Sequence, residues 1–128
     1  IINDSKSTSF SSTVGLLSTY KNIYWIVGGK FKKGDKFTLN KKYYKNIRAY
    51  LIGLDKRKFL NQLKNKIKFT YLKNLKRALM KIKKDIKKDN KLKIILFSPA
   101  AASFDQFKNF EQRGYLFNLQ TKKLLLDE

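Results

Sequence analysis

The chain has 128 residues, a mass of 15.1 kDa and a formal charge of +21 at pH 7, so we expect one ordinary domain. A hydrophobic content of 42% with 14% aromatic residues excludes a disordered chain, and no apolar run approaches the roughly 20 residues that span a bilayer. The absence of Cys and His excludes a disulfide framework, the ordinary zinc sites and any Ser-His or Cys-His nucleophile.

The excess of cations could indicate an anionic partner such as nucleic acid or a membrane surface. Of the 30 basic residues, however, 26 are Lys and only four are Arg, whereas bidentate readers of phosphates and bases are mostly Arg. The chain is also rich in Asn, Ile, Phe and Tyr, which together with Lys are the residues of A+T-rich codons. We therefore favour genome composition as the source of the charge. A basic nucleic-acid- or membrane-surface-binding module remains the alternative function.

The first eight residues pass from apolar to small polar side chains, which is typical of a strand end or linker leading into a helix over residues 11–17. Asp4, Ser5 and Thr8 are of the types that cap such a helix. A strand follows over Asn22–Val27, rich in β-branched and aromatic residues, and Gly28-Gly29 ends it.

The middle of the chain alternates between helical and strand periodicity. The predicted elements are a short helix over Leu39–Tyr44, a strand over Ile47–Ile52, an amphipathic helix over Asp55–Lys64, a strand over Ile67–Thr70 and a long basic amphipathic helix from Leu72 to Ile86. In this alternating context, the long helix is expected to cover a sheet rather than to lie on a membrane.

The last third of the chain begins with an apolar run, Leu92 to Phe97, which predicts a strand buried on both faces, and Ser98-Pro99 ends it. Ser103 followed by Gln106 forms a capping-box pattern and predicts a helix that begins at Ser103. A strand that leads directly into a helix amino terminus is where open α/β sheets bind ligands, and free amides there favour an anion.

After Gly114, apolar residues recur through a predicted terminal helix that packs on the sheet. These residues are Tyr115, Leu116, Leu119, Leu124, Leu125 and Leu126.

The succession of strands and helices predicts an α/β fold: a Rossmann-like single domain with a mostly parallel sheet and helices on both faces. No GxGxxG follows the first strand, and the chain has no GxxxxGK[ST] loop. The sequence therefore predicts neither Rossmann-type nucleotide binding nor a cradle for ATP phosphates.

Three segments resemble motifs of the Mur ligases that add D-glutamate. Residues 98–114, SPAAASFDQFKNFEQRG, match the family's SPAxASxDQFxNFExRG, with Ala101 and Phe104 where Cys and Leu are usual. Residues 3–9, NDSKSTS, match NDSKxTN except at Ser9. Residues 30–37, KFKKGDKF, resemble a segment after two glycines in which a Lys binds the incoming amino acid. Lys32 is the positional match there, although a shift by one position is possible.

By this resemblance, the chain (1–128) is the C-terminal domain of such a ligase, without its UDP-binding and ATP-binding domains. The implied D-glutamate-binding residues are Thr8, Lys32, Ser103, Phe104 and Phe110. Asp4 and Lys6 would face the nucleotide side, and no catalytic residue or metal ligand is expected in this chain.

The resemblance also implies an activity for the complete protein. ATP would phosphorylate the carboxylate of UDP-N-acetylmuramoyl-L-alanine, a peptidoglycan precursor, and the amino group of D-glutamate would attack the acyl phosphate, with ADP as a product. ATP and Mg²⁺ would be held mainly by the absent central domain, over which this domain closes. We expect the chain alone to be an inactive, cytoplasmic monomer without nucleic-acid or membrane partners.

Overall fold

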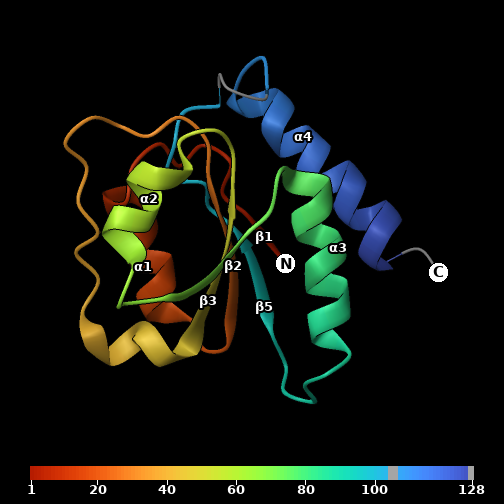
Figure 1. Cartoon of the computed structure of the whole chain (residues 1–128). Helices are drawn as coiled ribbons and strands as arrows, with labels where there is room; N and C mark the ends of the chain where they lie inside the picture. Colours follow the sequence, from red (N-terminus) through yellow and green to blue (C-terminus); the bar gives the residue numbers. More distant parts are fainter. Residues whose placement is uncertain (104–106, 127–128) are drawn as a thin grey trace.

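The computed structural model describes residues 1–103 and 107–126 (Figure 1). In chain order the elements are β1 (Ile2–Asn3), α1 (Ser11–Thr19), β2 (Ile23–Gly28), the 3-10 helix η1 (Lys41–Asn46), β3 (Ile47–Ile52), α2 (Lys56–Leu63), β4 (Lys68–Tyr71), α3 (Leu75–Ile86), β5 (Ile94–Phe97), α4 (Phe110–Thr121) and the π-helical turn η2 (Lys122–Leu126). Within the described residues, no helix is long and apolar enough to cross a membrane.

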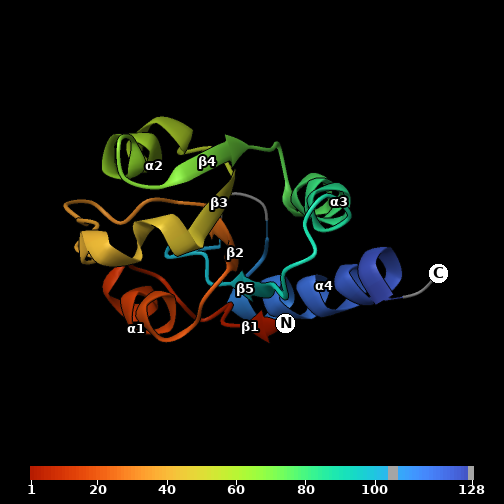
Figure 2. The same ribbon diagram turned by 90° about the horizontal axis from the view of Figure 1, so that it is seen from below.

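The five strands form one sheet in the order β1-β5-β2-β3-β4, and every neighbouring pair is parallel. Helices α1 and α2 lie on one face of the sheet, and α3 and α4 lie on the other (Figures 1 and 2). This arrangement confirms the predicted Rossmann-like α/β fold with helices on both faces.

Each face of the sheet carries its own hydrophobic layer. Strand β2 is buried along its whole length, as expected for a central parallel strand, and its side chains alternate between the two layers. On the α1 side, Phe10 is fully buried and its ring packs edge-on against those of Trp25, Phe37 and Phe59. On the α3 side, the ring of Phe117 stacks on that of Phe97 at a centroid distance of 4.5 Å.

Several predicted boundaries need correction. The segment predicted as a short helix over Leu39–Tyr44 is a 3-10 helix over Lys41–Asn46. The long helix begins at Leu75 rather than Leu72, because the Asn74 side chain accepts the Arg77 amide hydrogen and caps it. Leu92 is 86% exposed and precedes the strand that is predicted to include it.

The prediction that a helix begins at Ser103 is wrong. Residues 107–109 lie outside any helix, and α4 begins at Phe110 after the N-cap Asn109. The Asn109 side chain accepts the Gln112 amide hydrogen at 2.8 Å, and the Gln112 side chain accepts that of Lys108 at 2.6 Å. Asn109 with Gln112 therefore forms a variant of the capping box, in which Gln112 satisfies the amide before the N-cap, and Asn109 caps the start of the helix. Gln106 and Phe104 lie outside the described residues.

The terminal helix also differs from the prediction. Gly114 lies inside α4 rather than before it, and Tyr115 and Leu119 are 65% and 50% exposed instead of packing on the sheet. Phe117 is the residue of this stretch that is fully buried, while Leu124 and Leu125 pack at the edge of the same layer.

Candidate functional site

Three loops meet where β1, β5 and β2 end. The Ala100 amide donates to the Ser7 hydroxyl oxygen at 3.1 Å, and the Ala101 amide donates to the Ser7 carbonyl at 3.3 Å. Lys30 and Ala102 exchange two backbone hydrogen bonds of 3.0 and 3.1 Å. Residues 5–9, 28–32 and 98–103, which are far apart in the sequence, are thus side by side at the carboxyl edge of the sheet.

Gly28 allows this meeting because a side chain at its position has no room. Its φ is 125°, and an added Cβ would lie 2.0 Å from the Ile52 carbonyl oxygen on β3. The Gly28 amide instead donates to the Pro99 carbonyl at 2.9 Å, which joins the end of β2 to the loop after β5. Within that loop, Ala100 is fully buried with a φ of 54°, a left-handed conformation that residues with a Cβ atom adopt only rarely.

A chain of buried hydrogen bonds runs beneath these loops. The Ser98 hydroxyl donates to the Asp4 carboxylate at 2.7 Å, Thr13 lies 2.6 Å from Ser98, and Ser7 lies 2.6 Å from Thr13. A carboxylate can only accept, and each hydroxyl has a single proton. Ser98 must therefore donate to Asp4, Thr13 to Ser98 and Ser7 to Thr13, which leaves the Ser7 oxygen to accept the Ala100 amide. We call Asp4, Ser98, Thr13 and Ser7 the hydroxyl chain.

Arg113 holds the same loops from the side of α4. It is 1% exposed, and its guanidinium donates to the Ala101 carbonyl at 2.8 Å, to the Ser5 hydroxyl at 3.1 Å and to the Ser5 carbonyl. The Ser5 hydroxyl in turn donates to the Phe110 carbonyl at 2.7 Å. Gly114 packs closely here, because an added Cβ would lie 3.1 Å from the Ser5 Cβ. The planar fork of Arg can satisfy several carbonyls at once, which Lys cannot.

These contacts bear on the capping role that the sequence offers for the first motif. Asp4 and Ser5 do not cap α1, since they bond to Ser98 and Phe110 instead. The residue before α1, Phe10, makes no side-chain cap, and its amide donates to the Asp35 carboxylate at 2.8 Å. Asp35 therefore ties the loop that carries Lys32 to the start of α1.

The predicted substrate residues lie on these adjacent loops. Thr8 and Lys6 are exposed on the first loop, and Lys32 is exposed on the second, next to Lys33, which is also exposed. Ser103 is 3% exposed, and its carbonyl accepts the Phe107 amide. Phe110, the first residue of α4, is 45% exposed, and Phe104 lies outside the described residues. What these side chains bind stays a prediction.

Sequence reasoning did not single out Ser7, Thr13, Ser98 or Arg113 as positioning residues. A signal for Arg113 was present, because it is one of only four Arg in a chain whose ordinary cation is Lys. No comparable signal marks Thr13, whose partners lie 6 and 85 positions away. Among the described residues, no group of three or more Asp or Glu side chains could hold a metal ion.

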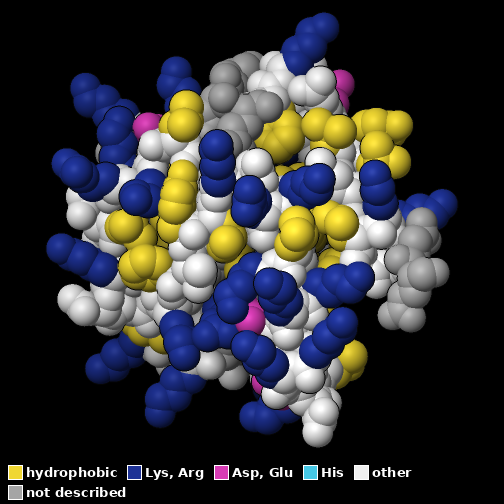
Figure 3. All heavy atoms as spheres, turned by 45° about the vertical axis from the view of Figure 1, so that its right-hand side comes forward, with side chains coloured by type: hydrophobic (Ala, Val, Ile, Leu, Met, Phe, Trp, Pro, Cys, Tyr) yellow, Lys and Arg dark blue, Asp and Glu magenta, His cyan; other side chains and the backbone are white. Residues whose placement is uncertain are grey.

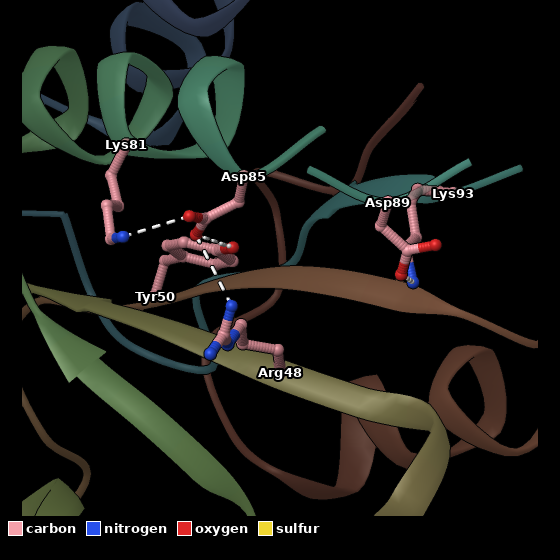
Figure 4. Close-up of polar contacts among 6 residues, drawn as sticks. All are labelled: Arg48, Tyr50, Lys81, Asp85, Asp89 and Lys93. Atoms are coloured by element: carbon pink, nitrogen blue, oxygen red, sulfur yellow. Dashed lines mark hydrogen bonds and ion pairs between the residues drawn. The ribbon is translucent and has the colours of Figure 1, made fainter. Parts of the chain in front are cut away.

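A second polar cluster lies between α3 and β3 (Figure 4). Asp85 is 4% exposed and accepts from the Tyr50 hydroxyl at 2.7 Å and from Lys81 at 2.9 Å, with Arg48 at 3.5 Å. Burial opposes ionisation of Asp85, but the hydrogen bonds from Lys81 and Tyr50, together with the two cations, lower its pKa overall. Burial, followed by the hydrogen bond to Asp85, raises the pKa of Tyr50. This cluster joins a helix to the sheet and is separate from the three loops.

The fold and the three matched segments define the class: an α/β domain of the Mur ligase type. No family model matches the chain. Curated relatives do match it, and the three that follow are each named UDP-N-acetylmuramoylalanine–D-glutamate ligase. The protein from Wolbachia sp. subsp. Brugia malayi is 40% identical over 123 residues, which is 96% of this chain and 25% of the relative. The protein from Rickettsia conorii is 43% identical over 117 residues, which is 90% of this chain and 23% of the relative. The protein from Hydrogenobaculum sp. is 37% identical over 124 residues, which is 96% of this chain and 29% of the relative.

The chain belongs to the family of UDP-N-acetylmuramoylalanine–D-glutamate ligases. It spans about a quarter of the length of the curated relatives that it matches. Nothing in the comparisons supports the alternative of a basic nucleic-acid- or membrane-surface-binding module.

Proposed function

We propose that the chain is the D-glutamate-binding, C-terminal domain of a ligase that adds D-glutamate to UDP-N-acetylmuramoyl-L-alanine in peptidoglycan precursor synthesis, with ATP consumed and ADP released. The observation that carries this proposal is the direct hydrogen bonding of the three motif loops at one edge of the sheet. The family relationship over at least nine-tenths of the chain supports it.

The proposed role follows from the chemistry of D-glutamate. This substrate carries two carboxylates that need hydrogen-bond donors and one amine that must stay free to attack. Lys32, Thr8 and Ser103 supply an ammonium and two hydroxyls from adjacent loops, and such charge-assisted bonds are the stronger ones. Phe110 would form an apolar wall, together with Phe104 beyond the described residues, and exclusion of water strengthens the neighbouring hydrogen bonds.

The acyl phosphate that reacts with D-glutamate would be bound by domains outside this chain. The amine of D-glutamate attacks the acyl carbon of the acyl phosphate, the new C–N bond forms, the C–O bond to phosphate breaks, and the amine loses a proton. The contribution of this domain is to hold the amine in position for attack. Asp4 and Lys6 would face the nucleotide.

The remaining components of the proposal concern the complete protein. ATP would supply the phosphoryl group, and ATP and Mg²⁺ would be held mainly by the central domain of the complete protein. UDP-binding and ATP-binding domains would complete a cytoplasmic, monomeric enzyme, and residues 1–128 alone would be inactive.

The test uses the complete ligase and three variants. Ser103→Ala removes a hydrogen bond to a charged group, worth roughly 1.5 to 3 kcal/mol, so kcat/KM for D-glutamate should fall roughly 10- to 150-fold while the KM for ATP stays nearly unchanged. Phe110→Ala should weaken D-glutamate use and also lower the stability of the domain. Lys84→Ala, on the exposed side of α3, is the control and should change neither. If Lys84→Ala impaired the ligase as much as Ser103→Ala, the site would be wrongly placed.

A further inference from the structure

A basic cleft of about 510 Å³ lies at the edge of the sheet opposite to the motif loops, where β2, β3 and β4 begin. Its lining includes five cationic side chains and one acidic one, namely Lys45, Arg48, Lys66, Lys68, Lys93 and Asp89. The volume is in the range of roughly 300–1,000 Å³ that is usual for small-molecule sites.

The register of the sheet builds one wall of this cleft. Tyr24 pairs with Arg48, and Arg48 pairs with Lys68, so the three residues form a row across β2, β3 and β4 on the same face. At one end of the row, Lys93 bonds to Asp89 at 2.8 Å, and its ammonium nitrogen lies 5.2 Å from the centre of the Tyr24 ring. Figure 4 shows Arg48 and Lys93 held near the sheet by their acidic partners, Asp85 and Asp89. Each of these two cations therefore has an acidic partner that holds it in position.

The other three cations are not neutralised in this way. Lys45 comes from the end of η1, Lys66 from the loop before β4 and Lys68 from β4 itself, and all three are exposed. None of them forms an ion pair with any part of the chain that the structure describes. Figure 3 shows that cationic side chains also cover the face that carries α3 and α4, with exposed hydrophobic ones among them in the upper part of the view. A cleft lined by charges of one sign focuses their electrostatic field and attracts ions of the opposite sign more strongly than the same charges would on a convex surface.

We propose that this cleft binds a phosphorylated small molecule that carries at least two negative charges. The three lysines supply the attraction, and phosphate oxygens accept hydrogen bonds from their ammonium groups. This site lies outside the motif loops, so the inference does not rest on the proposed binding of D-glutamate.

The test is calorimetric titration of the chain with inorganic triphosphate. In water, one lysine about 4 Å from a unit negative charge raises the binding affinity about fivefold. Lys68→Gln should therefore weaken triphosphate binding about fivefold. The triple variant Lys45→Gln, Lys66→Gln, Lys68→Gln should weaken it roughly a hundredfold. The matched control is Lys58→Gln, Lys76→Gln, Lys123→Gln, which removes the same charge from exposed positions outside the cleft. The control should bind nearly as tightly as the unaltered chain.

Amide chemical shifts locate the ligand independently of the variants. Triphosphate should shift the amides of Tyr24, Arg48 and Lys68, while those of Ser7 and Ala101 at the opposite edge stay in place. The proposal is overturned if the chain does not bind triphosphate, if both triple variants weaken binding equally, or if the shifts gather at the motif loops. The proposal is supported if the triple variant in the cleft binds triphosphate more weakly and the control triple variant does not. If motif variants left D-glutamate use unchanged while triphosphate still bound in the cleft, only the proposed ligase function would fail.

Discussion

Thr13→Val tests whether the hydroxyl chain holds the motif loops together. Val has nearly the shape of Thr, so the change removes the hydroxyl and leaves the packing of a fully buried residue almost unaltered. Two hydrogen bonds of 2.6 Å are lost, one to Ser98 and one to Ser7. At about 1 kcal/mol for each, the free energy of unfolding should fall by about 2 kcal/mol. The Ser12 hydroxyl, 3.0 Å from Ser7, can replace one partner and reduce the loss to about 1 kcal/mol, whereas leaving the buried Ser98 and Ser7 hydroxyls unsatisfied would raise it to about 3 kcal/mol.

Urea unfolding followed by tryptophan fluorescence measures this change directly. Trp25 is the single Trp of the chain, is fully buried, and donates to the Ser98 carbonyl at 2.7 Å, so it reports on the same loop. The midpoint should fall by about 1 M urea and the melting temperature by roughly 5–10 °C. Thr38→Val, at an exposed position, is the control and should change the stability by less than about 0.5 kcal/mol. A loss for Thr13→Val no larger than that of the control would show that the hydroxyl chain does not contribute to stability.

Three further predictions address other parts of the molecule. Gly28→Ala should prevent folding or cost more than about 3 kcal/mol, because its Cβ would meet the Ile52 carbonyl at 2.0 Å; a circular dichroism melt like that of the unaltered chain would contradict the close approach. The lowered pKa of Asp85 contributes stability that is complete above its ordinary value of 3.8 and is lost as the pH falls through the folded-state pKa. Asp85→Asn should therefore flatten the decline in urea midpoint below pH 3.8, and an unchanged slope would exclude this role. Finally, the chain alone should release no phosphate from ATP and form no peptide bond with D-glutamate, and any turnover by a clean preparation would disprove this.

The sequence is sufficient to predict the architecture because the pattern of apolar residues differs between helices and strands. It predicts the strand over Ile47–Ile52 with its observed bounds, and the buried run of β2 follows directly from its continuous hydrophobicity. Helix starts are less certain, because capping patterns are short and can compete. Ser103 with Gln106 and Asn109 with Gln112 both match the capping-box pattern, and the contacts of α4 select the second.

The motifs, too, can be recognised in the sequence, and the residues of the three segments are enough to indicate the family. Only the tertiary structure shows which buried residues hold these three segments together. Thr13 and Arg113 join the loops through hydrogen bonds to residues as far as 85 and 108 positions away, and such partners leave no periodic trace in the chain. The basic cleft likewise arises only when the starts of three parallel strands align, because the register that places Tyr24, Arg48 and Lys68 in one row is a property of the assembled sheet. Local residue preferences therefore determine the elements, while long-range hydrogen bonding and register determine which side chains share a site.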